Sequence, residues 1–127
     1  MRDIKFRAWE NYNIEMVYFD NEKSANDPYI AQHLLLLLAD KHPNGPALVM
    51  QFTGLLDKNG VEIYEGDIVS DHVGVGSVEY IEHHGSFRVN YNDGKAKWFV
   101  DYTLRGERGS IEVIGNIHEN PKLLEAS

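Results

Sequence analysis

An acidic segment in the middle of the chain, GLLDKNGVEIYEGDIV at positions 54–69, carries the densest set of side chains that could do chemistry. Two carboxylates drawn from Glu62, Glu65 and Asp67 could serve as a general acid and a general base. Turns and strand ends also collect such residues without any catalytic task, because Asp and Asn bond the local backbone and glycine accepts positive φ. The composition of the segment therefore favours architecture over catalysis, and we expect no catalytic residue in it.

The same acidic side chains offer oxygen ligands for calcium. A calcium loop places glycine at its sixth position and ligands at the first, third and fifth. Counting from Asp57, Gly60 falls at the fourth position and the apolar Val61 at the fifth. The spacing does not fit, so we expect no calcium site.

Histidine is the other candidate metal ligand, and the chain has six. The neighbours His83 and His84 would point to opposite faces of a strand and could not share one ion, although a turn would allow it. The sequence contains no cysteine, which excludes disulfides, thiolate catalysis and thiolate metal sites. We expect the chain to hold no metal and no cofactor.

Basic residues around one tryptophan form the best candidate nucleic-acid patch. They are Arg88, Lys95 and Lys97, and the indole of Trp98 could stack on a base beside them. The whole chain, however, has 12 basic and 20 acidic residues and a formal net charge of -8. Nucleic-acid binders usually gather their basic residues on one face, so the charge balance disfavours nucleic acid as the partner.

The bulk composition describes an ordinary soluble domain. A chain of 127 residues with 43% hydrophobic and 25% charged residues is large enough to bury one core. Its longest apolar run, Leu34 to Ala39, is far shorter than the roughly 20 residues of a membrane span, and the charged opening MRDIKFRAWE does not fit a signal peptide. We expect one domain over residues 1–127, cytoplasmic and without membrane contact.

The chain opens with a predicted hairpin over residues 1–20. The stretch IKFRAWE alternates apolar and polar residues with the period of a half-buried strand. Asn11 to Asn13 supply a turn, and a second strand follows through Met16 to Phe19.

Residues 21–47 are predicted to carry one inserted helix near residues 28–42. Asp27 and Pro28 form a helix start, because the aspartate can cap free amides and proline suits the first helical position. Leu35 and Leu36 widen the apolar stripe beyond a normal core face. Either the helix is sandwiched inside the fold, or these two leucines form an interface with a second copy of the protein.

Residues 48–120 read as a β core, followed by a tail over residues 121–127. Six or more short strands, separated by turns about every ten residues, predict a small, strongly bent antiparallel sheet or barrel. The fold class is therefore mainly β, of the α+β type. The residues expected to build its turns are Asp57, Asn59, Gly60, Gly66, Asp67, Asp93 and Gly94.

Three blocks of the sequence stand out together: IKFRAW, QFTGLLDKNGVEIYEGDIV and IEVIGNIHENPKLLE. They resemble the YopX family, small proteins encoded by bacteriophages and prophages. They occur in the expected order, whereas the segment around the leucine-rich helix matches no pattern of the family. The resemblance implies a mainly β fold of phage origin, with no established catalytic residues to carry over.

These observations predict a phage or prophage accessory protein that is not an enzyme and works by binding protein. We expect it to form a homo-oligomer in the host cytoplasm and to bind a host or phage protein. One alternative is a small nucleic-acid-binding barrel that uses the patch around Trp98. The other is an acidic decoy of a host DNA-binding protein, which would draw on the negative net charge.

Overall fold

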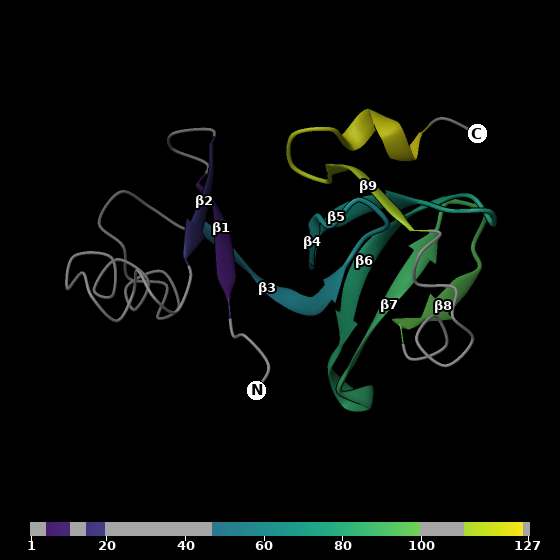
Figure 1. Ribbon diagram of the computed structural model, residues 1–127, viewed down its shortest axis with the longest axis horizontal. Coiled ribbons are helices and arrows are strands. Elements are labelled where there is room, and N and C mark those ends of the chain that lie inside the picture. The colour runs from purple at the N-terminus through teal and green to yellow at the C-terminus, as the bar shows by residue number, and fades with distance from the viewer. Residues whose placement is uncertain (1–4, 11–14, 20–46, 100–110, 126–127) are drawn as a thin grey trace. The chain divides into compact units, whose positions relative to one another are not determined.

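The computed structural model describes residues 5–10, 15–19, 47–99 and 111–125 (Figure 1). The chain divides into two compact units, Met1–Gly54 and Leu55–Ser127. The predicted helix near residues 28–42, with Leu35 and Leu36, lies outside the described residues. No helix among the residues described is long and apolar enough to cross a membrane.

The first unit is built on three antiparallel strands in the order β2-β1-β3. They are β1 (Phe6–Glu10), β2 (Glu15–Phe19) and β3 (Ala47–Leu56), whose last two residues belong to the second unit. The hydrophobic residues Ala8 and Phe19 form a small core, with Val17 and Val49 packed against it.

The first strand is more deeply buried than its alternating pattern predicts. Arg7 is 3% exposed and Glu10 is 2% exposed, so charged residues of β1 are covered as well as apolar ones. Both edges of β1 are paired, with Arg7 opposite Tyr18 on one side and Met50 on the other. The expectation of a half-buried strand was therefore wrong for this central strand, in which polar residues also lie inside.

The second unit contains a five-stranded antiparallel sheet in the order β8-β7-β6-β5-β9. Its strands are β5 (Asp67–Ser70), β6 (Val75–Ile81), β7 (Ser86–Tyr91), β8 (Ala96–Trp98) and β9 (Glu112–Asn116). The short β4 (Glu62–Tyr64) neighbours the end of β3. The described residues of this unit also form the 3-10 helices η1 (Glu82–His84) and η3 (Pro121–Leu124).

The five-stranded sheet is strongly curled (Figure 1). A bulge between Ile68 and Val69 shifts the register of β5 against β9, and bulges bend and twist the strands that carry them. The observed fold confirms the predicted mainly β class and its strongly bent antiparallel sheet.

Alternate residues of the strands fill the core of the second unit. Val78, Val89 and Tyr91 on β6 and β7 point to one face, where they pack with Ile63 and Ile111. The intervening residues of the same strands form the opposite, outer face, because successive side chains of a strand alternate. The outer face is therefore the place where partly exposed polar and aromatic residues collect.

Candidate functional site

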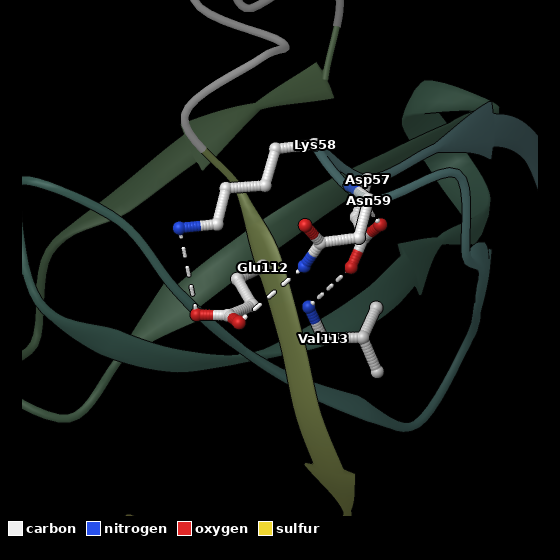
Figure 2. Close-up of polar contacts among 5 residues, drawn as sticks. All are labelled: Asp57, Lys58, Asn59, Glu112 and Val113. Atoms are coloured by element: carbon white, nitrogen blue, oxygen red, sulfur yellow. Dashed lines mark hydrogen bonds and ion pairs between the residues drawn. The ribbon is translucent and has the colours of Figure 1, made fainter.

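The turn that follows β3 is held by the carboxylate of Asp57. Its Oδ1 atom accepts hydrogen bonds from the backbone nitrogens of Asn59 at 2.8 Å and Val61 at 2.9 Å. Its Oδ2 atom accepts a third bond, at 2.9 Å, from the backbone nitrogen of Val113 on β9 (Figure 2). One side chain thus closes its own turn and also ties that turn to a distant strand.

The turn and β9 are joined by further contacts around this carboxylate (Figure 2). The backbone nitrogen of Lys58 donates to the carbonyl oxygen of Ile111 at 2.9 Å. The Lys58 ammonium lies 3.6 Å from Glu112, and the Asn59 amide donates to the same carboxylate at 3.4 Å. Because the Lys58 and Glu112 side chains are 45% and 42% exposed, this ion pair adds little stability, and the backbone bonds carry the connection.

The protonation of Asp57 follows from the same geometry. Burial, with 7% of the residue exposed, would by itself raise the pKa of the carboxyl. The backbone donors at Val113, Val61 and Asn59, with the nearby Lys58 charge, outweigh burial and hold the pKa of Asp57 below its ordinary value of 3.8. Asp57 is therefore a charged acceptor at neutral pH and is poorly suited to donate a proton.

Two further aspartates serve turns in a similar way. Asp67 is 2% exposed and accepts a bond from the backbone nitrogen of Tyr64 at 2.7 Å. Asp71 accepts hydrogen bonds from the backbone nitrogens of Val73 and Gly74, and the hydroxyl of Tyr91 donates a hydrogen bond to it at 2.6 Å. Sequence reasoning missed Asp71, although an aspartate three residues before a glycine is a usual turn signal.

An asparagine organises the chain after β9. Asn116 Oδ1 accepts the backbone nitrogens of His118 at 3.0 Å and Glu119 at 2.9 Å. In return, Asn120 Oδ1 accepts the backbone nitrogen of Asn116 at 3.3 Å. The motif asparagines, like the aspartates, thus satisfy local backbone donors, which is a structural use of polar side chains.

The candidate nucleic-acid patch is only partly assembled. Arg88 and Trp98 are directly opposite each other across β7 and β8, with the guanidinium carbon 5.6 Å from the indole centroid. Lys97 is paired with the buried Val89 and lies on the other face of the sheet. Lys95 lies in the turn before β8, where its ammonium is 3.9 Å from Asp93.

Strand alternation in the sequence contained the signal that separates these residues. Lys97 and Trp98 are neighbours in one strand, so their side chains must point to opposite faces. The structure places Asp93 and Gly94 in the turn between β7 and β8, and Gly94 has φ of 92°. Lys95 follows this turn, where its backbone oxygen accepts a hydrogen bond from the backbone nitrogen of Tyr91 at 2.8 Å, three residues beyond Arg88 on β7.

A cross-strand row forms on the outer face where the patch was expected. Glu79 on β6 is opposite Arg88 on β7, and the Arg88 Nε donates to the Glu79 carboxylate at 2.5 Å. Trp98 on β8 continues the row, and the ring of His84 packs 4.9 Å from the indole, centroid to centroid. We call these four residues, Glu79, Arg88, Trp98 and His84, the outer row.

The two neighbouring histidines lie in the 3-10 helix η1 and not in a strand. Their ring centroids are 4.8 Å apart, so the turn geometry that allows them to approach is present. Within the described parts of the chain, no group of three or more His, Asp or Glu side chains is arranged to hold a metal ion.

Comparison with known protein families finds a match for this chain. The family described as YopX protein matches residues 5–125, nearly the whole chain. The chain belongs to the YopX family. The resemblance to this family is thus confirmed, and in this YopX chain the central block builds the Asp57 turn.

The solved structures include a similar protein. It is protein EF1440 from Enterococcus faecalis, which is 28% identical to this YopX chain and aligns with 95% of it and 97% of its own length, at a TM-score of 0.48. Among curated proteins, no match to the chain is found.

Proposed function

We propose that this YopX protein is a non-enzymatic protein-binding module, encoded by a phage or prophage as an accessory protein. The observation that carries the proposal is the outer row, in which Arg88 and Trp98 form a partly exposed pair beside Glu79. Arginine and tryptophan are enriched among the residues that dominate protein–protein binding energies.

The use of the motif carboxylates supports a non-catalytic role. Asp57, Asp67 and Asp71 each accept hydrogen bonds from backbone nitrogens of their own turns. A general acid or base must instead reach a substrate and exchange a proton with it near neutral pH. The lowered pKa of Asp57 places that group outside this range.

Nucleic-acid binding is the first alternative, and the geometry gives it less support. A nucleic-acid chain requires several cations that follow its phosphates. On the outer face Arg88 is neutralised by Glu79, while Lys95 is near Asp93 and Lys97 lies on the core side. The acidic-decoy alternative rests on the net charge of -8, and no arrangement of the described residues favours it further.

Photo-crosslinking from the outer face tests the proposed function. Asn90 is exposed and lies two residues after Arg88 on β7, opposite Ala96 of β8. Replacing Asn90 with the photoreactive benzoylphenylalanine should capture a protein from nuclease-treated lysate of phage-infected host cells. The same residue placed at Val73, which is exposed in the turn between β5 and β6, serves as the matched control.

The supporting result is one protein captured from position 90 and not from position 73, and lost when Trp98→Ala is added to a chain that still folds. Equal capture from both positions would show adventitious contact. Absence of any capture from position 90 would contradict binding through this face.

A further inference from the structure

We propose that the Arg88 guanidinium is a receptor for a single carboxylate, which an Asp or Glu side chain of a protein partner supplies. This inference rests on the proposed protein-binding function and specifies the chemistry that the partner presents. Its basis is the way in which the outer row fixes the guanidinium and leaves part of it unused.

Two neighbours hold Arg88 in place. Its Nε donates to Glu79 Oε1 at 2.5 Å, and its guanidinium carbon lies over the Trp98 ring at 5.6 Å. These contacts come from the strands on either side of β7, so the side chain is positioned from both directions. An arginine that is already ordered loses less conformational entropy when it binds a ligand.

The two terminal nitrogens of Arg88 are the part left for a ligand. Within the described part of the chain, Glu79 and Trp98 are the groups that engage Arg88, and the hydrogen bond to Glu79 uses Nε. The Arg88 side chain is 31% exposed, so solvent and partners reach it. Paired terminal N–H groups match the two oxygens of a carboxylate, which makes such recognition geometrically specific.

The surroundings of Arg88 favour one carboxylate over a run of phosphates. The Glu79 charge already balances the guanidinium, and an ion with several charges would be repelled by it. A single carboxylate from a partner would instead bind the side of the Arg88 guanidinium that Glu79 does not use, so that the guanidinium lies between two acids.

Aromatic surface beside the guanidinium suits a peptide segment. The exposed His84 ring packs against Trp98 and extends the indole surface at the end of the row. Side chains that flank the partner's carboxylate can pack on this surface, while the carboxylate accepts hydrogen bonds from the two terminal nitrogens of Arg88, which we call the Arg88 fork. A partly desolvated arrangement of this kind strengthens a charge-assisted hydrogen bond.

A titration of the full chain followed by nuclear magnetic resonance tests the inference. The probe is the blocked tripeptide acetyl-Gly-Glu-Gly-amide, and its Gln counterpart is the matched control. The reporters are the Nε–H of Arg88 and the indole N–H of Trp98, with the second tryptophan, Trp9, as the internal reference. The Glu peptide should shift both reporters in a saturable way with a dissociation constant on the order of millimolar, while the Gln peptide should not.

Two variants separate recognition from general charge. Arg88→Lys keeps the positive charge but lacks the planar fork, and it should weaken binding of the Glu peptide about fivefold or more. Glu79→Gln retains an oxygen acceptor for Nε and removes the adjacent negative charge. Because that charge repels the carboxylate of the Glu peptide, its removal should strengthen binding of the peptide roughly a few-fold.

Several results would overturn the carboxylate receptor. Equal shifts with the Glu and Gln peptides, or unchanged affinity in Arg88→Lys, would contradict recognition by the fork. Shifts produced by short oligothymidylate and not by the Glu peptide would assign the row to nucleic acid. If crosslinking from position 90 persists in Arg88→Lys and the Glu peptide gives no shift, the protein-binding function stands and the carboxylate inference fails. If the Glu peptide binds but position 90 captures no protein, Arg88 recognises a carboxylate and the protein-binding function is contradicted.

Discussion

The carboxylate of Asp57 accepts a hydrogen bond from the backbone nitrogen of Val113, 56 positions later in the sequence, at 2.9 Å. The same carboxylate closes its own turn through Asn59 and Val61. The contact therefore couples a local turn to the edge strand β9, and its loss should affect both.

Asp57→Asn should destabilise the second unit by about 2 kcal/mol. The amide that replaces the carboxylate has one oxygen and one NH₂ group, so at least one of the three backbone donors loses its acceptor. Urea unfolding, followed by tryptophan fluorescence and circular dichroism, measures the change. Asp93→Asn is the matched control, because Asp93 is exposed in its turn and accepts one backbone bond; it should change stability by less than about 0.5 kcal/mol.

The stabilising effect of Asp57 should disappear in acid. Its pKa in the folded state lies below the ordinary value of 3.8, so the folded protein favours the charged form more than the unfolded chain does. The contribution is fully present above pH 3.8 and is lost as pH falls through the lower folded pKa. The difference in unfolding free energy between wild type and Asp57→Asn should shrink between pH 6 and pH 2, and a constant difference would contradict this assignment.

Gly76→Ala should destabilise the β6–β7 pair. A Cβ atom at Gly76 would lie 2.6 Å from the carbonyl oxygen of Asn90 and 2.9 Å from the Cα of Tyr91, so backbone atoms would have to move. The expected cost is roughly 1–3 kcal/mol, measured by urea unfolding. Ser77→Ala, in the same strand, should stay within about 0.5 kcal/mol of wild type. If Gly76→Ala changes the unfolding free energy as little as Ser77→Ala does, the contact of the new Cβ atom with the β7 backbone is relieved without cost and the prediction is wrong.

Leu35 and Leu36 lie outside the described residues, and the prediction that they mediate self-association stays a prediction. Glu at both Leu35 and Leu36 should yield a folded protein with a smaller assembly, because charge in an apolar interface opposes association. Sedimentation velocity measures the size, and Gln32→Glu is a control for added charge in the same segment. An unfolded product would place the leucines in the monomer core, and an unchanged size would contradict the interface.

Local chemistry made the turns and the fold class predictable from sequence. Asp57, Gly60 and Gly94 follow from residue preferences that act within a few positions, because side-chain oxygens bond nearby amides and glycine accepts positive φ. In β6 and β7 buried and less buried residues alternate along much of each strand, because successive side chains of a strand point to opposite faces.

Contacts between distant segments were not predictable in this way. The bonds from Val113 to Asp57 and from Tyr91 to Asp71 join residues 56 and 20 positions apart, and no spacing rule connects them. The row of Glu79, Arg88 and Trp98 depends on the register of three strands. A register is set by the complete sheet, so basic residues that are close in sequence do not identify a common surface.

The position of β9 has a consequence for synthesis of the protein on the ribosome. Among the described strands β9 is translated last, yet it pairs with β5 and supplies the donor that reaches Asp57. A nascent chain that ends before Glu112 therefore has an open edge on β5 and an aspartate without this donor. Contacts so far apart in sequence form slowly, and completion of the second unit must wait until β9 has emerged.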